Sequence, residues 1–471
     1  MRVAVEPSGR ETIPSWPSVT EARGGPPAGP TYRTPFAFTN AFRSDPIGFY
    51  GAAFRTFGDV VCFRSPPFRS FFLAHPDHIK HVLQDNNHNY VKGVVIAKLK
   101  VLIGEGLFTS EGDFWRRQRR LAQPAFHRQR LAGFVATMTD ATAALVERWE
   151  EPARRGAPVD VAADMSRLTL GIVGRTLFSR RLDDDADAFG AVLVEALELL
   201  NVRAMSFVSS PLWWPTTRNR RLRRAIGALD RVVFDIIETR RRAGDARDDL
   251  LGMLLQARDE DTGEGMTDRQ LRDEVMTFLL AGHETTAVAL TWTWHLLAEH
   301  PEVEARLAAE TTAALGGRVP TIEDLPRLQY ARMVVEEAMR LYPPVWGYIR
   351  QALGPDTVGG YRIPKGAVIS ICPYVTHRHP EFWDDPERFD PERFTPERVR
   401  TRPRFAYLPF SGGPRLCIGN EFAVMEAQLV LAMAVQRYRL RSVPGVDVTP
   451  ESRITLRPRG GMPMTIAAVR A

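Results

Sequence analysis

Cysteine is scarce in this sequence. The 471 residues include only Cys62, Cys372 and Cys417. Three cysteines cannot form a disulfide framework, and because none stands in a CxxC pair, they offer no zinc or iron–sulfur ligand set. We therefore expect a reducing, cytoplasmic setting, in which Cys62 and Cys372 are packing residues.

Lysine is also rare and supplies only five of the 62 basic residues, so the rest are arginines. With 56 acidic residues, the formal net charge is +6. The arginines are spread along the chain rather than gathered in one tract, so the composition does not favour a nucleic-acid partner. A basic face still suits an acidic protein partner.

Long apolar runs are missing. No window approaches about 18 uninterrupted apolar residues, so the sequence predicts no transmembrane anchor. Residues 1–45 are rich in proline and glycine and lack the apolar core of a signal peptide. We expect them to form a loosely ordered leader, followed by one large domain over residues 46–471.

The periodicity of apolar residues predicts a mainly helical chain with a few short strands. Residues 58–74 are typical of two strands around a Pro-Pro turn, whereas residues 91–107 show no clean period. Helices are predicted at about 129–150, 164–179, 186–201, 219–242 and 249–257.

The most informative stretch is Phe410-Ser-Gly-Gly-Pro-Arg-Leu-Cys-Ile-Gly419, which leads into an apolar helical run. A cysteine just before a helix N-terminus lies where unpaired N–H groups favour a thiolate. The glycines allow a flat partner to approach, and Arg415 can hold an anion. This combination suits an iron porphyrin with Cys417 as ligand, although a lone cysteine can equally be a buried residue in a turn.

A second unusual stretch is the helix predicted from Thr267 to about Glu299, whose middle is polar where a buried helix should be apolar. Small Ala281 leaves room beside the helix, and the Thr285 hydroxyl can bond the carbonyl four residues earlier and open a groove. Glu284 and Thr285 then form a plausible proton-delivery pair. The alternative is an ordinary helix with a threonine kink.

Two further helices carry pairs of residues at helical spacing. Trp115 and Arg119 share a face and can bind a carboxylate together, unless that face is simply solvated. Glu337 and Arg340 are three residues apart and can form an ion pair, for which an exposed position is the ordinary expectation.

Taken together, these motifs resemble those of the cytochrome P450 family, in family order. The resemblance implies a mainly α fold with a minor β region, haem b as cofactor, and Cys417 as the axial ligand of its iron. It also implies that a set of side chains holds or lines the haem: Trp115, Arg119, Ala281, Arg350, Phe410, Arg415 and Gly419.

The resemblance assigns roles elsewhere too. Glu337 and Arg340 would form a buried structural triad with Arg393, and residues 186–242 would form a lid over the substrate pocket. His377 and His379 would lie in a loop, either near a haem propionate or at the surface. The pocket itself would be lined by Val94, Val95, Leu107, Phe278, Val345 and Trp346, which together predict a lipophilic substrate.

The implied activity is monooxygenation, in which one atom of O2 enters a substrate by hydroxylation or epoxidation. Fatty acids, terpenoids, steroids and polyketides are the candidate substrates. No glycine-rich nucleotide fingerprint is present, so we expect electrons from NAD(P)H to arrive through a reductase and a ferredoxin or flavodoxin. We expect a monomer. Peroxide-driven or rearrangement chemistry on the same fold, and a non-catalytic haem sensor, remain alternatives.

Overall fold

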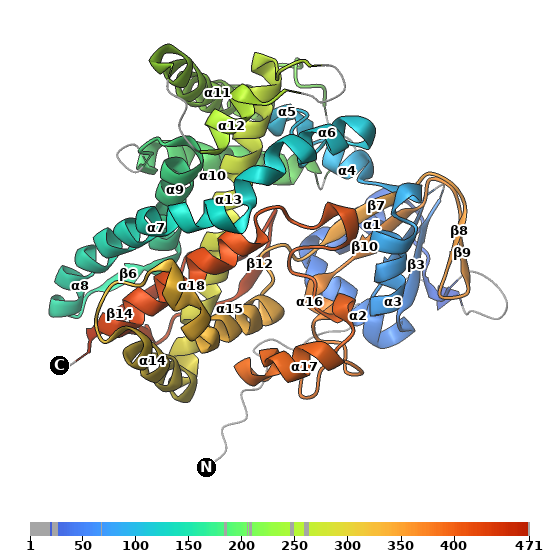
Figure 1. Cartoon of the computed structure of the whole chain (residues 1–471). Helices are drawn as coiled ribbons and strands as arrows, with labels where there is room; N and C mark the ends of the chain where they lie inside the picture. The colour runs from blue at the N-terminus through green and yellow to red at the C-terminus, as the bar shows by residue number, and fades with distance from the viewer. Residues whose placement is uncertain are drawn as a thin grey trace.

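The computed structural model describes residues 19–20, 27–66, 68–182, 186–204, 206, 210–244, 249–258 and 263–469. Helices fill most of the molecule, and β3, β7 and β10 gather beside α2 and α3 at one side (Figure 1). The prediction of a mainly α fold with a minor β region is confirmed. None of the described helices is long and apolar enough to cross a bilayer.

The helices are α1 Pro35–Ser44, α2 Pro46–Phe57, α3 Pro76–Lys80, α4 Gly93–Ala97, α5 Lys100–Ile103, α6 Gly112–Ala122, α7 Arg128–Arg148, α8 Glu150–Arg155, α9 Val161–Phe178, α10 Ala186–Ala204, α11 Thr217–Ala243, α12 Leu250–Gln256, α13 Asp268–Glu299, α14 Pro301–Leu315, α15 Gln329–Leu341, α16 Pro373–Thr376, α17 Pro396–Thr401 and α18 Asn420–Arg437. The strands are β1 Val19–Thr20, β2 Gly29–Pro30, β3 Val60–Ser65, β4 Phe68–Leu73, β5 Tyr90–Val91, β6 Pro158–Asp160, β7 Tyr348–Ala352, β8 Asp356–Val358, β9 Tyr361–Ile363, β10 Val368–Ile371, β11 Tyr438–Ser442, β12 Pro450–Ser452, β13 Leu456–Pro458 and β14 Pro463–Ala468.

Helix α13 is the central element of the helical region. Its start is fixed by the predicted capping box, since Thr267 Oγ1 accepts from the Gln270 N–H at 3.3 Å and Gln270 Oε1 accepts from the Thr267 N–H at 2.8 Å. The helix packs against α9, α15 and α18, and most of its residues are buried. A helix buried on most sides is a firm base for a functional site.

The largest sheet joins N-terminal strands to strands from the second half of the chain. Its strand order is β3-β4-β10-β7-β5, and the predicted hairpin of β3 and β4 is present. Strand β10 lies parallel to β4, with Ile371 opposite Leu73. Because β10 also pairs with β7, this pairing brings the N-terminal hairpin and β7 into one sheet.

Part of the predicted leader is ordered secondary structure. Residues 27–45 are described, and they include α1, whose Ala37 N–H donates to Thr34 Oγ1 at 3.2 Å. Tyr32 is buried. The expectation of loose order is therefore wrong for residues 27–45, whereas residues 1–18 and 21–26 lie outside the described chain. The domain boundary at residue 46 stays a prediction.

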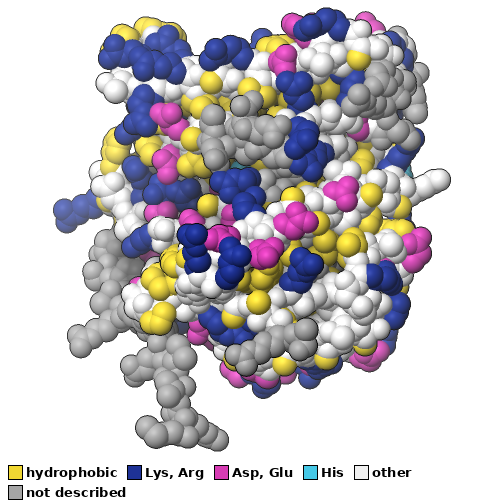
Figure 2. All heavy atoms as spheres, turned by 90° about the vertical axis from the view of Figure 1, so that its left-hand side faces the viewer, with side chains coloured by type: hydrophobic (Ala, Val, Ile, Leu, Met, Phe, Trp, Pro, Cys, Tyr) yellow, Lys and Arg dark blue, Asp and Glu magenta, His cyan; other side chains and the backbone are white. Residues whose placement is uncertain are grey.

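Surface charge is mixed on the face shown in Figure 2. Lysine and arginine side chains are scattered across this face, with acidic and hydrophobic side chains between them. This distribution agrees with the spread of arginine along the sequence.

Candidate active site

The cysteine loop places one thiol beside open space. The Cys417 N–H donates to the carbonyl oxygen of Phe410 at 3.0 Å, which closes the loop just before α18. Arg119 on α6 donates through Nη1 to the carbonyl oxygen of Leu416 at 2.8 Å. Although protein atoms surround the loop, Cys417 itself is exposed. Its sulfur is therefore available to a ligand.

The glycines of this loop serve the protein's own packing. A Cβ on Gly412 would lie 2.4 Å from the Phe405 ring, and one on Gly413 would lie 2.0 Å from the carbonyl oxygen of Leu83. Only Gly419 has ordinary clearance, with Phe126 as its nearest neighbour at 3.7 Å. Gly412 and Gly413 are therefore required by protein packing, and their predicted role in letting a flat partner approach stays a prediction.

Burial and nearby donors act in opposite directions on the pKa of Cys417. Burial raises the pKa of the thiol, and the Gly419 N–H and the Arg119 guanidinium only partly oppose this effect. The thiol is thus the favoured form before a metal binds. A coordinated metal ion removes the thiol proton, so the thiolate belongs to the metal-bound state.

A cluster of cations lies beside the loop. Arg415 pairs with Glu111, donates through Nη1 to the carbonyl oxygen of Ser110 at 3.1 Å, and lies 3.7 Å from the centre of the Trp115 ring. Arg350 is 8% exposed, and its described hydrogen bond goes to the carbonyl oxygen of Ile349 at 2.9 Å. Among described residues it forms no direct ion pair, and the charge of Glu111 only partly opposes the effect of burial on its pKa.

Lys92 completes the cluster, and sequence reasoning missed it. Its Nζ donates to the carbonyl oxygens of Leu107, at 3.3 Å, and Phe108. Burial, and then the charge of Arg415, lower the pKa of Lys92 to about 7. A solitary lysine forms no motif, and the only signal was its rarity in an arginine-rich chain.

The middle of α13 forms a second part of the site. Thr285 Oγ1 donates to the carbonyl oxygen of Ala281 at 2.7 Å, which is the predicted bond back along the helix. Ala281 is exposed although its helix is largely buried. Glu284 accepts from Thr455 Oγ1 at 2.7 Å. Burial raises the pKa of Glu284, while Thr455 and Arg457 act in the opposite direction.

One aromatic contact connects these two parts. Phe126 is the nearest neighbour of Gly419 and stacks on Phe278 of α13, with ring centres 5.5 Å apart. The predicted apolar wall at Phe278 therefore lies near the cysteine loop.

The other predicted pocket residues differ in how deeply they are buried. Leu107 is buried, and Val95 and Val345 are partly buried. Val94 is 60% exposed. Trp346 packs in a separate core cluster with the N-terminal helices and donates to the carbonyl oxygen of Arg453 at 2.8 Å. Its position is that of a packing residue rather than a pocket wall.

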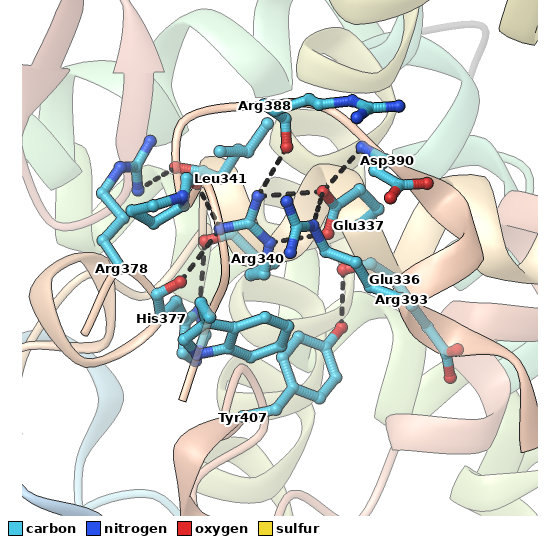
Figure 3. Close-up of polar contacts among 12 residues, drawn as sticks. Glu336, Glu337, Arg340, Leu341, His377, Arg378, Arg388, Asp390, Arg393 and Tyr407 are labelled. Carbon is cyan, nitrogen blue, oxygen red and sulfur yellow. Dashed lines mark hydrogen bonds and ion pairs between the residues drawn. The ribbon is translucent and has the colours of Figure 1, made fainter. Parts of the chain in front are cut away.

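The predicted triad is present and buried (Figure 3). Arg340 donates to both carboxylate oxygens of Glu337, at 2.6 and 2.8 Å, and both residues are fully buried. Arg393 lies 3.4 Å from Glu337 Oε1. Arg340 also donates to the carbonyl oxygens of His377 and Arg388, each at 3.0 Å. The exposed alternative is therefore wrong, and the triad joins α15 to the segment before the cysteine loop.

Both predicted roles of His377 and His379 are unsupported. His377 is fully buried, donates through Nδ1 to the carbonyl oxygen of Arg340 at 3.2 Å, and accepts through Nε2 from the Leu408 N–H at 2.9 Å. His379 is 5% exposed and pairs with Asp59 at 2.9 Å. Neither side chain is at the surface, and each has a protein partner.

Comparison with known proteins decides the family. A sequence model described as Cytochrome P450 matches residues 27–462. This chain belongs to the cytochrome P450 family. It is 39% identical over 398 residues to a cyclooctat-9-en-7-ol 5-monooxygenase of Streptomyces melanosporofaciens, covering 83% of this chain and 84% of the relative. It is 36% identical to a pentalenene oxygenase of Streptomyces avermitilis, covering 85% and 88%.

A solved structure agrees with these relatives. The crystal structure of a cytochrome P450DA heme domain superposes with a TM-score of 0.85 at 30% identity, covering 94% of this chain and 98% of that one. This P450 is therefore a monooxygenase, and its family implies a haem cofactor.

The residues of the site fit a haem. Its two propionates are anions, and Lys92, Arg350 and Arg415 bring three cations together. The carboxyl groups of Glu111 and Glu274 also act on this cluster, and burial raises the pKa of Glu274 to about 7. The exposed Cys417 thiol supplies a soft ligand for iron. Arg119 donates through Nη1 to the carbonyl oxygen of Leu416 and so also contacts the cysteine loop, and its predicted bond to a propionate stays a prediction.

Proposed function

We propose that this P450 oxygenates a cyclic terpenoid. One atom of O2 enters a C–H or C=C bond of the substrate, and two electrons and two protons reduce the other atom to water. The observation that carries this proposal is the similarity, over more than four-fifths of the chain, to enzymes named for cyclooctat-9-en-7-ol and pentalenene. The apolar wall of Leu107, Phe126 and Phe278 supports it, because such a substrate offers few polar groups.

The proposed roles of the site residues follow from their placement. Cys417 would bind the iron of a haem, and the haem would supply the activation of O2. Lys92, Arg350 and Arg415 hold the propionates, and Trp115 supports Arg415 through their stacked contact. These contacts orient the cofactor against α13.

Side chains of α13 deliver the protons. Ala281 leaves room beside the helix, and the Thr285 hydroxyl donates a hydrogen bond to the carbonyl oxygen of Ala281. Glu284 takes up and releases protons at its carboxylate, whose oxygen Oε2 has no hydrogen-bond partner among the described residues. This pair favours monooxygenation over peroxide-driven chemistry, which needs no proton delivery to O2.

Electrons come from a separate ferredoxin or flavodoxin that an NAD(P)H-dependent reductase reduces. The docking face proposed for it is the basic surface of α6 beside the cysteine loop, where an open hollow is lined by Trp115, Arg116, Arg119, Arg120, Gln123, Pro124 and His127. We place the enzyme in the cytoplasm as a monomer.

The test is a spectrum followed by turnover. The protein purified after growth with ample haem should show the thiolate-type band of a ferrous carbonyl complex, and Cys417→Ala should lose it. Pentalenene and cyclooctat-9-en-7-ol should displace the water ligand in the ferric spectrum, and one of them should gain a single 18O atom from 18O2. A protein without the thiolate band contradicts the proposal.

The same assay separates the alternatives. Turnover with peroxide but not with reduced ferredoxin would favour peroxide-driven chemistry. A non-catalytic haem sensor would gain support if no oxygenated product formed with either oxidant and Thr285→Ala left every assayable property unchanged.

A further inference from the structure

The turn between β12 and β13 lies against the middle of α13. Thr455 in this turn is 2% exposed, and its Oγ1 donates to Glu284 Oε1 at 2.7 Å. The turn is fixed on two other sides, because the Leu456 N–H donates to the carbonyl oxygen of Pro344 at 2.9 Å and Trp292 Nε1 donates to that of Leu456 at 2.7 Å. The position of the Thr455 hydroxyl is thus set by contacts with two separate segments, α13 and the loop at Pro344.

The same hairpin reaches α10. Arg457 on β13 pairs through Nη2 with Glu198 Oε1 at 3.0 Å, and through Nε with Glu451 Oε2 at 3.6 Å. Glu198 belongs to α10, in the region where the family resemblance places the lid. One short hairpin therefore contacts both the lid helix and the acid at the centre of α13.

We propose that Thr455 is a positioning residue for Glu284, and that the Arg457–Glu198 pair couples the protonation of Glu284 to the position of α10. This inference rests on the proposed role of Glu284 in proton delivery. When α10 lies against the hairpin, Glu198 neutralises much of the charge of Arg457. When α10 moves away, Glu451 alone is left to offset the charge of Arg457, and the less compensated guanidinium favours the carboxylate form of Glu284.

The charges around Glu284 make this coupling specific. Arg457 is the charged group among the described residues whose field acts on the Glu284 carboxyl, and it opposes the effect of burial. Arg453 in the same turn is paired with Glu451 at 2.9 Å. On the α9 side, His283 hydrogen-bonds Ser166 at 2.8 Å, and burial lowers the pKa of His283 to about 4, so it is neutral near pH 7.

Two substitutions should act in opposite directions. Thr455→Val removes a donor to the carboxylate and keeps the shape of the side chain, so the pKa of Glu284 should rise. Glu198→Gln leaves Arg457 with less compensation, so the pKa of Glu284 should fall. Thr455→Ser retains the hydroxyl and should behave like the wild type.

Infrared titration of the resting holoenzyme measures this directly. The carboxyl band that disappears in Glu284→Gln identifies the group, and its midpoint should move by about one pH unit upward in Thr455→Val and downward in Glu198→Gln. Thr449→Val is the matched control, since Thr449 bonds Asp447 in the approach to the same hairpin. Shifts in the same direction, or no shift, would overturn the proposal.

Turnover gives a second readout. In Thr455→Val the fraction of consumed O2 that is released as hydrogen peroxide should increase several-fold, and Thr455→Ser should restore the wild-type fraction. An unchanged fraction in Thr455→Val would count against the positioning role. If the protein lacked the thiolate-type spectrum, the proposed function would fail, while the infrared midpoints would still decide the coupling.

Discussion

At the scale of single residues, His377 shows how a buried imidazole can hold a loop together. Its two ring nitrogens bond the carbonyl oxygen of Arg340 and the N–H of Leu408, so the ring is a neutral tautomer with a proton on Nδ1. Burial, opposed only in part by the Arg340 carbonyl, lowers the pKa of His377 to about 3. A charged ring would break the bond to Leu408.

This arrangement predicts a pH dependence of stability. Below about pH 6.5 the unfolded chain binds a proton at this histidine, whereas the folded protein stays neutral until about pH 3. The free energy of unfolding should therefore decrease as the pH falls through this window, by about 1.4 kcal/mol per pH unit from this group. Urea unfolding at several pH values should show a shallower decrease for His377→Gln.

A matched control is available for that experiment. His88 is exposed, and His88→Gln should keep the wild-type slope. Equal slopes for the wild type and His377→Gln would contradict the assignment of a neutral, buried ring.

The residues of the site differ in how far sequence could predict them. Cys417, Arg415 and Thr285 stand in motifs whose spacing sets their chemistry. The structure leaves Cys417 exposed and places Thr285 on the expected carbonyl oxygen, whereas the contacts of Arg415 with Trp115 and Glu111 were not predicted. Lys92 could not be found in this way, because the cation cluster forms only when Arg350 and Arg415 come from distant segments to lie near Lys92. Trp346 was misplaced because an aromatic residue beside a pocket and one in a core look alike in sequence.

At the scale of elements, the cysteine loop depends on the backbone of Gly413. This residue has φ of 65°, and a Cβ would lie 2.0 Å from the carbonyl oxygen of Leu83. Gly413→Ala should therefore shift the loop and lower the haem content of the purified protein, with a loss of stability of about 1–3 kcal/mol. Haem absorbance per polypeptide and thermal unfolding measure both effects.

Gly133→Ala is the contrasting variant. Gly133 lies in α7, is exposed, and has no atom within 4 Å of the Cβ position. Because alanine is the better helix former, this change should leave haem content unchanged and stabilise the fold by about 0.5–1 kcal/mol. A loss of haem in both variants would show that the effect is not specific to the loop.

Most long elements were predictable because their signals are local. The predicted helix at 129–150 is α7, Arg128–Arg148, and the capping box at Thr267 gave the start of α13. Helix α1 was missed because proline and glycine dominate the residues before it, although Thr34 followed by Pro35 is a helix start signal. Residues 91–107 became two short helices, α4 and α5, that have too few turns to show a period.

At the scale of the whole molecule, the proposed docking face on α6 makes reduction by an acidic ferredoxin dependent on charge. Arg120 is exposed on α6, next to the Arg119 that holds the cysteine loop. Arg120→Glu should slow electron transfer from ferredoxin by about tenfold at low salt, and the difference should shrink as salt screens the surface. Stopped-flow formation of the ferrous carbonyl band measures the rate.

The control places the same charge change on another helix. Arg218 is exposed near the start of α11, and Arg218→Glu should leave the reduction rate within twofold of the wild type. An equal decrease in both variants would indicate an effect of net charge rather than of a docking face.

The parallel pairing of β4 with β10 has a consequence for biosynthesis. The partner of β4 leaves the ribosome about 300 residues after it, which corresponds to roughly 15–60 s of translation. Until then one edge of the Phe-rich β4 has no strand to cover it, and such an edge invites association between nascent chains. The hairpin must therefore be shielded during synthesis, and the sheet beside the cysteine loop can close only once β10 has emerged.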